Sequence, residues 1–315
     1  MKIVVLEKDC VTEGDIDYSA LDSVASVEYY GTIDSELVPS VIGDSDGVIV
    51  NKTRIGIDVF EKCKNLKYVG TFATGYNNID VENAKKYGIT VCNVPFYSTE
   101  GVAQLTIAFL LQTATSLDKY QKSVNNGDWM SSKKFCYFPY EITEVAGKTL
   151  GIIGFGSIGQ RVAEIATALK MNVIVNSRTK KQSSYEFVSK EELLRRSDWV
   201  SLHLPLTKDS ENLIDENALS LMKNTAVLIN TARGGLIDED ALATALKQGE
   251  IKASCHDVVK FEPMRSDCPL FNLQNCYITP HVAWAGQETR QRLVNIAAEN
   301  VKMFIEGKAQ NVVSK

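Results

Sequence analysis

One stretch of the sequence, residues 147–178, constrains the fold more than any other. It begins with an apolar run, Thr149–Ile153, and continues with a segment from Ile158 to Lys170 in which apolar residues recur at helical spacing. A second run of β-branched residues, Val173–Val175, follows. Strand, helix and strand in this order predict a βαβ unit, whose helix packs on a parallel sheet.

Three glycines stand between the first strand and the helix of this unit. In the pattern Gly154-x-Gly156-x-x-Gly159 they can cradle the pyrophosphate of a dinucleotide at the helix N-terminus. Gly154 would allow the tight turn, Gly156 the approach of phosphates to the backbone, and Gly159 close packing of helix on strand. The alternative is a tight turn without a ligand. We expect a nucleotide cofactor, because glycines, strands and an amphipathic helix occur together.

Composition narrows the class of protein. At 315 residues the chain is longer than one hydrophobic core usually serves, so two domains are expected. A formal net charge of −5, with lysines and arginines scattered, argues against a nucleic-acid-binding surface. No apolar run is long enough to span a bilayer, which argues against a membrane protein.

The N-terminal residues and the cysteines favour a cytoplasmic location. The segment MKIVVLEKDC is interrupted by Glu7, so it lacks the apolar region of a signal peptide and is interpreted as a first strand. The seven cysteines are dispersed and form no CxxC pair. This is expected of reduced thiols rather than of a disulfide framework or a zinc site.

Short β-rich runs alternate with helical segments on both sides of the glycine turn. This alternation predicts parallel sheets with helices on their faces, and hence an α/β fold. The expected strands are 3–6, 47–50, 68–72, 90–92, 149–153, 173–175, 199–202, 226–229, 253–257 and 277–279. The expected helices are 58–63, 80–87, 99–117, 158–170, 190–195, 216–222, 238–248 and 289–306.

The segment from Tyr120 to Thr149 is predicted to be a long loop. It lacks clear periodicity and concentrates aromatic residues at positions 129, 135, 137, 138 and 140. A loop of this length is usually functional or covers another surface. Exposed aromatic residues would form a surface for a partner, and the alternative is that they pack on their own domain.

The chain offers three histidines as candidates for a general acid. His203 lies in the apolar run WVSLHLPL and is interpreted as a core histidine with satisfied hydrogen bonds, whereas His256, at a strand end, is ambiguous. His281 follows the last strand and is the best placed for a cleft. We therefore expect His281 to carry the proton-transfer chemistry.

Two further residues can act on an acidic substrate. Arg233 follows a strand in the stretch NTARGG, and its planar guanidinium can grip a carboxylate or polarise a carbonyl. The alternative for Arg233 is a surface ion pair with Asp238 or Glu239. Glu262 stands in a loop, where an exposed glutamate is the ordinary case. The sequence shows no nucleophile elbow, Walker loop or metal-ligand cluster.

Taken together, these motifs resemble those of the D-isomer-specific 2-hydroxyacid dehydrogenases. The glycine turn is followed by NTARGG, FEP and TPHVAW, so Arg233, Glu262 and His281 stand in that family's catalytic order and spacing. The resemblance covers nearly the whole chain, since YVGTFATGYNNID, GITVCNVP and VAQLTIAFLL in the first half share it. Asn51-Lys52-Thr53 and the tryptophan after His-Val-Ala are similar to the glycerate dehydrogenase (hydroxypyruvate reductase) branch. The segment HDVVKFEPM departs from the family's usual sequence pattern, Leu-Asp-Val-Phe-x-x-Glu, around the glutamate.

The resemblance implies two Rossmann-like, doubly wound parallel-sheet domains. A discontinuous, flavodoxin-like substrate domain would comprise residues 1–97, completed by 289–315, and an NAD(P)-binding domain would comprise residues 98–288. It also implies a homodimer assembled through residues 120–147.

The resemblance further implies the residues that contact cofactor and substrate. The implied cofactor contacts are Gly154, Gly156, Ser157, Ile158 and Gly159 at the pyrophosphate, Ser177 and Arg178 at the ribose end, Leu204 and Pro205 at the adenosine side, Thr231 and Asp257 at the nicotinamide, and Ala232. The implied substrate contacts are Lys52, Thr74, Gly75 and Arg233, with backbone near Gly75 holding the substrate carboxylate. For Lys52 the alternative is a solvated surface lysine, and for Gly75 a residue that serves only the turn.

The expected chemistry follows from the charges of the three catalytic candidates. Reduction of a 2-oxo acid needs a hydride at C2 and a proton at the carbonyl oxygen, and protonated His281 can supply that proton. Glu262 beside it would favour the imidazolium and fix the ring orientation. Arg233 would grip the carboxylate and carbonyl and align C2 with the nicotinamide.

The end of the second strand departs from a plain NAD fingerprint. Such units usually carry an acidic residue there, which binds the ribose hydroxyls and repels a 2′-phosphate. Here the strand runs into Asn176, Ser177 and Arg178, followed by Thr179, Lys180 and Lys181. With three cations and no acid, this end favours NADP(H), and NAD(H) is the alternative.

Three functions compete at this stage. The leading one is an NAD(P)-dependent dehydrogenase that interconverts a small D-2-hydroxy acid and its 2-oxo acid, such as glycerate and hydroxypyruvate or glycolate and glyoxylate. The second is a cofactor-sensing interaction protein, as in the co-repressors that resemble this family, although the chain lacks the basic segments of an adaptor. The third is a dehydrogenase of the same fold for D-lactate, formate or phosphite.

Overall fold

The computed structural model describes residues 1–179 and 182–314. The chain divides into two compact units. Unit 1 comprises Met1–Ser98 together with the chain from Trp284 onwards, and unit 2 comprises Thr99–Ala283. The sequence had placed the corresponding boundaries after residue 97 and before residue 289. The α/β fold class with two parallel-sheet domains is confirmed.

Unit 1 is built on a five-stranded parallel sheet with the strand order β2-β1-β3-β4-β5. This is the flavodoxin-like order expected for the first domain. The strands are β1 (Lys2–Val5), β2 (Ser26–Tyr29), β3 (Gly47–Val50), β4 (Tyr68–Thr71) and β5 (Thr90–Cys92). The strand β2 was missed by the sequence analysis, because it lies at the sheet edge and alternates exposed with half-buried residues.

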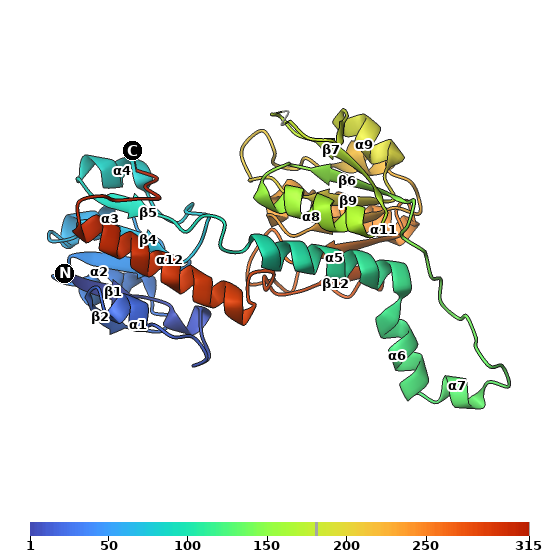
Figure 1. Ribbon diagram of the computed structural model, residues 1–315, viewed down its shortest axis with the longest axis horizontal. Coiled ribbons are helices and arrows are strands. Elements are labelled where there is room, and N and C mark those ends of the chain that lie inside the picture. Colours follow the sequence, from blue (N-terminus) through green and yellow to red (C-terminus); the bar gives the residue numbers. More distant parts are fainter. Residues whose placement is uncertain (180–181, 315) are drawn as a thin grey trace. The chain divides into compact units, whose positions relative to one another are not determined.

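Helices cover both faces of this sheet, which is why its central strands are continuous apolar runs. On one face pack α1 (Ser19–Asp22) and α12 (Gln287–Ile305), and Figure 1 shows α12 lying along the sheet. On the other face pack α2 (Val38–Ile42), α3 (Ile57–Lys62) and α4 (Val81–Lys86). Two short 3-10 helices complete the unit, η1 (Lys8–Cys10) and η2 (Ser35–Leu37).

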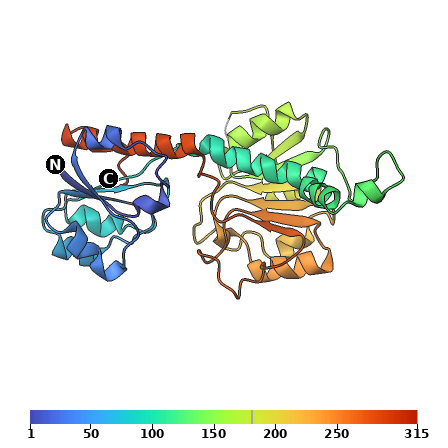
Figure 2. The same ribbon diagram turned by 90° about the horizontal axis from the view of Figure 1, so that it is seen from below.

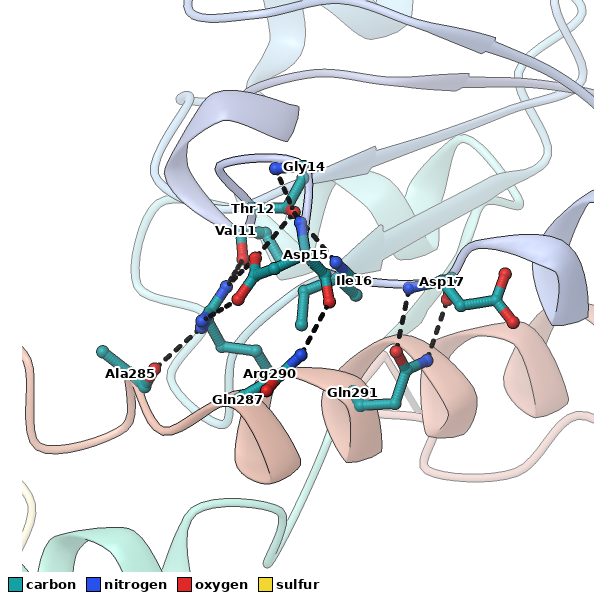
Figure 3. A network of polar contacts seen from close by, with 10 residues as sticks. All are labelled: Val11, Thr12, Gly14, Asp15, Ile16, Asp17, Ala285, Gln287, Arg290 and Gln291. Atoms are coloured by element: carbon teal, nitrogen blue, oxygen red, sulfur yellow. Dashed lines mark hydrogen bonds and ion pairs between the residues drawn. The ribbon is translucent and has the colours of Figure 1, made fainter.

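The C-terminal part of the chain is bonded to the rest of unit 1 at two places. Beyond α12, Val312 forms an antiparallel bridge with Cys92, and the Val313 N–H donates to the Val91 carbonyl at 2.9 Å. At the start of α12, Arg290 grips the loop of residues 11–17 (Figure 3): its two terminal nitrogens lie 2.8 and 2.7 Å from the two carboxylate oxygens of Asp15.

Further contacts in the same network fasten this loop to α12. Arg290 also donates to the Val11 carbonyl at 3.0 Å, and Gln287 to the Asp15 carbonyl at 3.0 Å. Gln291 exchanges two hydrogen bonds with the Asp17 backbone, at 2.9 and 2.8 Å (Figure 3). Segments at opposite ends of the sequence are thereby joined within one unit.

Unit 2 is built on a seven-stranded parallel sheet with the order β12-β11-β10-β9-β6-β7-β8. Counted from β6, this is the classic dinucleotide-binding order extended by one strand, with the topological switch point between β6 and β9. The strands are β6 (Thr149–Ile153), β7 (Asn172–Asn176), β8 (Glu186–Phe187), β9 (Trp199–Leu202), β10 (Val227–Asn230), β11 (Ala253–His256) and β12 (Cys276–Ile278). All but the two-residue β8 were predicted, with bounds exact for β6 and β9.

Helices also cover both faces of the second sheet (Figure 2). On one face pack α5 (Thr99–Thr115) and α8 (Ser157–Ala168), and on the other α9 (Lys190–Arg196), α10 (Glu216–Ser220) and α11 (Glu239–Gln248). A 3-10 turn, η3 (Gly234–Leu236), follows β10. Gly249 ends α11 with a left-handed φ of 72°, which glycine adopts more easily than other residues.

The prediction of a long loop from residue 120 was partly wrong. The structure places α6 (Leu117–Asn125) and α7 (Asp128–Ser131) in it, before an extended stretch that leads to β6. Helix α6 buries only Ser123, although Leu117, Tyr120 and Val124 recur in it at helical spacing, a pattern that the sequence analysis overlooked. We call residues 117–142 the arm; Figure 1 shows it projecting from the rest of unit 2.

Two general features of the described residues bear on function. No helix among them combines the length and the apolar character needed to cross a membrane. All seven cysteines are free thiols.

We expect Arg290→Ala to lower the thermal unfolding midpoint of unit 1, measured by circular dichroism at pH 7. Hydrogen bonding to Arg290 lowers the pKa of the Asp15 carboxyl, so this contribution is present above the unfolded carboxyl pKa of about 4 and is lost as the pH falls below it. The difference in midpoint should therefore shrink between pH 7 and about pH 3. Lys302→Ala, on the same helix but in an exposed pair with Glu299, is the control and should change little.

Candidate functional site

The glycine turn between β6 and α8 is shaped by backbone-to-backbone packing. Gly154 has a left-handed φ of 93°, and a Cβ there would lie 2.3 Å from the His203 carbonyl oxygen. A Cβ at Gly159 would lie 2.2 Å from the carbonyl oxygen of Gly154. Neither position has room for a side chain, because β9 and α8 pack directly on the turn.

Gly156 differs from both of these glycines. A Cβ built on it would meet no atom within 4 Å, so the space in front of the helix N-terminus is open there. Gly156 caps α8, whose first backbone N–H groups, from Ser157 onward, have no intrahelical partner. An open, donor-rich helix start fits the pyrophosphate of a dinucleotide.

The predicted adenosine contacts surround the same turn. Asn176 ends β7 and accepts a hydrogen bond from the Gly154 N–H at its carbonyl, at 2.8 Å, while its side chain donates to the Val188 carbonyl at 2.9 Å. After it, Ser177 is half-buried and Arg178 is exposed. Leu204 and Pro205 follow β9 on the other side of β6. Lys180 and Lys181, named as additional cations, lie outside the described residues.

Neither His203 nor His256 is available as an acid near neutral pH. Burial lowers the pKa of His203 to about 3 and that of His256 to about 4. His203 Nε2 lies 2.7 Å from the Ser201 hydroxyl, but its Nδ1 is buried without a protein partner among the described residues. The interpretation of His203 as a satisfied core histidine was therefore half right, and the ambiguity over His256 is resolved in favour of the core.

Arg233 lies in a turn that a buried amide shapes. Asn230, at the end of β10, accepts from the Ala232 N–H at 3.0 Å and donates to the Arg233 carbonyl at 2.9 Å. The Arg233 side chain is exposed and donates to the Ala232 carbonyl at 2.6 Å. Among the ion pairs of the described residues, none joins Arg233 to Asp238 or Glu239. Its guanidinium thus stays at the surface of the turn.

Glu262 and His281 meet in one hydrogen-bonded pair. His281 Nδ1 lies 2.7 Å from Glu262 Oε2, and the two side chains are 27% and 33% exposed. The other carboxylate oxygen, Oε1, accepts from the Val259 N–H at 3.2 Å. A carboxylate at Nδ1 fixes that nitrogen as the donor and leaves Nε2 directed elsewhere.

The turn that carries His281 is held by Asp257, which is 1% exposed. Its carboxylate accepts from the Thr279 hydroxyl at 2.7 Å and from the N–H groups of Val282 and Ala283 at 2.8 and 2.9 Å. The His281 N–H donates to the Asp257 carbonyl at 2.8 Å. Burial raises the pKa of Asp257, while these hydrogen bonds favour its ionised form. Asp257, predicted as a cofactor contact, thus has a structural role that the sequence did not indicate.

Sheet register places Arg233 and His281 at the same edge. Asn230 of β10 pairs with His256 of β11, and His256 pairs with Ile278 of β12. Arg233 follows Asn230 by three residues, and His281 follows Ile278 by three residues. The strands β10 and β12 are separated by β11, so their carboxyl ends lie about 10 Å apart. A small acidic molecule held by the guanidinium can reach the imidazole across such a span.

Thr231 lies between Asn230 and Ala232 and is largely buried. Its hydroxyl is 3.0 Å from the hydroxyl of Thr106 in α5. This bond ties the start of the Arg233 turn to the helix that covers the sheet. The predicted nicotinamide contact of Thr231 stays a prediction.

In unit 1, the residues predicted to contact substrate lie at the carboxyl edge of its sheet. Lys52 follows β3, and Thr74 and Gly75 follow β4. The Thr74 hydroxyl donates to the Val94 carbonyl at 2.8 Å, and Asn93 donates to the Thr74 carbonyl at 2.8 Å. These bonds fix the loop that presents the Gly75 backbone.

The loop that carries Lys52 is held by Glu7, which the sequence analysis did not select. One oxygen of this buried carboxylate accepts from the N–H groups of Asn51, Lys52 and Thr53, at 2.9, 2.8 and 2.8 Å. Three converging N–H groups form an anion-binding concavity, and here the chain supplies the anion itself. The only signal in the sequence was an acidic residue directly after a predicted apolar strand.

Comparison with known proteins gives a consistent result. The family profile described as "D-isomer specific 2-hydroxyacid dehydrogenase, NAD binding domain" matches residues 107–283. A hydroxypyruvate reductase of Blautia hydrogenotrophica is 41% identical over 322 aligned residues that cover 100% of both chains. A glycerate dehydrogenase of Methylorubrum extorquens is 40% identical over 91% of both chains.

Solved structures agree on the fold. The TT0316 protein of Thermus thermophilus superposes with a TM-score of 0.89 at 34% identity, covering 99% of this chain and 100% of the other. A protein described as acyclic imino acid reductase (Bsp5), in complex with NADPH and D-Arg, superposes with a TM-score of 0.88 at 34% identity and the same coverage.

The glycine turn yields a prediction that separates folding from ligand binding. Gly154→Ala should lower the thermal unfolding midpoint, because alanine tolerates neither the left-handed φ nor the contact with His203. Gly156→Ala should leave the midpoint nearly unchanged and weaken NAD(P)H binding by about tenfold, since its methyl group stands where phosphates would approach. Fluorescence titration with NADPH and NADH measures the affinity; equal affinities of wild type and Gly156→Ala would contradict the prediction.

Proposed function

The chain belongs to the D-isomer-specific 2-hydroxyacid dehydrogenase family, and on this premise we propose that it reduces small 2-oxo acids, hydroxypyruvate and glyoxylate first among them, to the corresponding D-2-hydroxy acids. It is an NAD(P)-dependent oxidoreductase that interconverts 2-hydroxy and 2-oxo acids. The choice of substrates rests on relatives named hydroxypyruvate reductase, glycerate dehydrogenase and glyoxylate reductase.

The observation that carries the proposal is the Glu262–His281 pair at the same sheet edge as Arg233. His281, held through Nδ1 by Glu262 at 2.7 Å, offers Nε2 as the proton donor to the substrate carbonyl oxygen. Arg233 grips the substrate carboxylate and polarises the carbonyl, because its planar fork matches both oxygens. Imidazolium and guanidinium together stabilise the negative charge that develops on the oxygen.

The residues of the glycine turn fit a nicotinamide dinucleotide. Gly154, Gly156, Ser157, Ile158 and Gly159 would hold its pyrophosphate, and Thr231, Ala232 and Asp257 would border its nicotinamide ring. When bound, the cofactor supplies the hydride for C2 of the substrate. The protein aligns C2 and provides the proton.

We propose that Lys52, Thr74 and Gly75 of unit 1 contact the substrate. The loops that carry these residues are fixed by Glu7 and Asn93, as expected of a preorganised site. The cytoplasmic location and the domain roles assigned to residues 1–97 with 289–315 and to residues 98–288 stay predictions.

The assay that tests the proposed activity is oxidation of NADPH and NADH with a panel of 2-oxo acids. We expect turnover with hydroxypyruvate and glyoxylate. Turnover of pyruvate alone, or oxidation of formate or phosphite alone, would show that the proposed substrates are wrong and that the enzyme acts on that other substrate. Tight cofactor binding without turnover of any of these substrates would favour a cofactor-sensing interaction protein.

Replacing the partner of the acid should move the pH profile of reduction. Reduction needs the protonated ring of His281, so its rate should fall as the pH rises and the ring loses its proton. In Glu262→Gln a neutral amide no longer favours imidazolium, so this fall should shift to lower pH and kcat should drop about tenfold or more. Glu250→Gln, an exposed glutamate of the same unit, is the control. A profile that stays in place would exclude Glu262 as the partner.

We further propose a preference for NADPH over NADH. Arg178 is exposed at the end of β7, and Asn176 and Ser177 supply no carboxylate that would repel a 2′-phosphate. The similar protein described in complex with NADPH supports this preference. The neighbouring Lys180 and Lys181 add two further cations in the sequence.

The preference for NADPH should be about 10- to 100-fold in kcat/KM, the value of one charge-assisted phosphate contact of about 1.5–3 kcal/mol. The double variant Ser177→Asp with Arg178→Ala should reverse it, since it removes a cation and adds the missing acid. Ser184→Asp, further along the same connection, controls for added charge alone. Equal kcat/KM for both cofactors in the wild type would contradict the preference and leave the dehydrogenase activity standing.

We propose that the arm forms a homodimer interface. Large apolar side chains are exposed along it: Leu117, Val124, Trp129, Met130, Phe135, Phe138 and Ile142. Phe135 is 94% exposed and Met130 86%. A projecting segment with this much apolar surface is typical of a protein–protein interface.

Sedimentation should show a species near twice 34.8 kDa. Phe138→Asp should shift it toward the monomer, because a carboxylate would be buried in the interface. Phe271→Asp, an exposed phenylalanine outside the arm, should not. A fully active wild-type monomer would exclude the dimer as a requirement for function.

A further inference from the structure

Glu239, the first residue of α11, is 8% exposed. An acidic residue in the first turn of a helix is common, because it interacts favourably with the helix dipole, but it is usually exposed. Glu216 shows the ordinary case: it occupies the same position in α10, directly after a capping aspartate, and is exposed. Burying a carboxylate costs free energy unless it is hydrogen-bonded. The buried carboxylate of Glu239 therefore needs a hydrogen-bond donor.

That donor is a backbone group of the loop after β11. Glu239 Oε1 accepts from the Lys260 N–H at 2.6 Å, 21 residues along the chain. Its Oε2 lies 3.9 Å from the Cys268 sulfur. Burial raises the pKa of the Glu239 carboxyl, and the bond and charge of Lys260 favour the ionised form.

The same loop is held from its other side by the Arg233 turn. A Cβ at Gly234 would lie 2.0 Å from the Val259 carbonyl carbon and 2.4 Å from the Lys260 nitrogen. The backbone at Gly234 therefore packs directly on the peptide that joins Val259 to Lys260. This peptide is fixed between Gly234 on one side and the Glu239 carboxylate on the other.

Each group of catalytic residues adjoins a residue that forms or contacts this peptide. Arg233 directly precedes Gly234 in the chain. The Val259 N–H donates to Glu262 Oε1 at 3.2 Å, and Glu262 Oε2 bonds His281 Nδ1 at 2.7 Å. The Val259–Lys260 peptide is thus the point at which the turn of the guanidinium meets the loop of the acid/base pair.

We propose that Glu239 is a positioning residue, which holds the Val259–Lys260 peptide against Gly234 and thereby sets the placement of the Glu262–His281 pair relative to Arg233. This role rests on the proposed function for its consequence in catalysis. The effect of Glu239 on the His281 ring is independent of the proposed function, because it can be measured without substrate.

Among the described residues, the Glu239 carboxylate has hydrogen bonds to the Lys260 N–H and to the Cys268 sulfur, and the first is the shorter. Glu239 lines a cavity of about 190 Å³ together with charged residues of α11 and the loop after β11. The charged residues of that lining are Asp238, Asp240, Lys260, Arg265 and Asp267. Without the Glu239 carboxylate, the Lys260 N–H would turn toward this cavity and draw the loop away from Gly234.

The test compares Glu239→Leu, which removes the acceptor, with Glu239→Gln, which keeps one. The readouts are kcat and KM for hydroxypyruvate and the titration of the His281 ring protons by NMR. The His281 signals are identified by their loss in His281→Gln, and His203 and His256 titrate at lower pH, because burial lowers their pKa to about 3 and about 4. Glu216→Leu is the matched control.

We expect Glu239→Leu to lower kcat by about 10- to 100-fold with the KM for NADPH nearly unchanged, as for a displacement of reacting groups by about 1 Å. Glu239→Gln should stay within about threefold of wild type, and the His281 titration curve should move in Glu239→Leu in the same direction as in Glu262→Gln. In the double variant the two effects should not multiply, because both act through the same pair. Glu239→Asp, which withdraws the carboxylate from the Lys260 N–H by one methylene group, should change the curve in the same direction if Glu239→Leu does not fold.

The inference is overturned if the His281 curve of Glu239→Leu superimposes on that of wild type, or if the effects of Glu239→Leu and Glu262→Gln multiply. It is also overturned if Glu216→Leu changes the curve equally. A wild-type protein that turns over no 2-oxo acid would instead contradict the proposed function, and the NMR comparison would still decide the role of Glu239.

Discussion

Unpaired backbone N–H groups at the carboxyl ends of parallel strands are the constraint on which both units depend. A strand that ends in a loop leaves donors that must be satisfied, and buried donors without partners are costly. The chain meets this need with buried carboxylates: Glu7 accepts three N–H groups after β3, Asp257 accepts two N–H groups and a hydroxyl after β12, and Glu239 accepts one after β11. Each acid lies outside the loop it organises, so each loop is shaped by a partner distant in sequence. The loops that carry Lys52, Glu262 and His281 are held in this way.

Glycine packing supplies the second constraint, and it works without side chains. Gly159 packs on the carbonyl of Gly154, Gly154 on the carbonyl of His203, and Gly234 on the peptide after Val259. At each contact a methyl group would lie closer than 3 Å to backbone, which cannot yield as a flexible side chain does. Gly156 is the exception, since space is open in front of it. Three glycines therefore fix the framework, and the fourth leaves room for a ligand.

The sequence predicted most of the fold and led to the proposed reactive residues, but it indicated few of the residues that hold them in place. Central strands such as β6 and β9 were placed exactly, because a strand buried on both faces is a continuous apolar run. The edge strand β2 and the polar helix α6 lack that signal and were missed. Arg233, Glu262 and His281 stand in short motifs that can be read locally. The roles of Glu7 and Asp257 depend on contacts 22 to 46 residues away, which no local pattern encodes.

The placement of His281 shows why these supports matter. His281 has a left-handed φ of 56°, which costs a residue with a side chain of order 1–3 kcal/mol. Hydrogen bonds from the flanking N–H groups to the Asp257 side chain, each of about 1 kcal/mol, offset this cost. Asp257 thus fixes the backbone of the histidine and Glu262 fixes its ring, and both acids belong to the connection between β11 and β12. A displacement of that connection would weaken the 2.7 Å contact between Glu262 and His281, because Glu262 belongs to the connection and His281 follows β12. It would also change the distance between Glu262 and Arg233, which is set where Gly234 meets the Val259–Lys260 peptide.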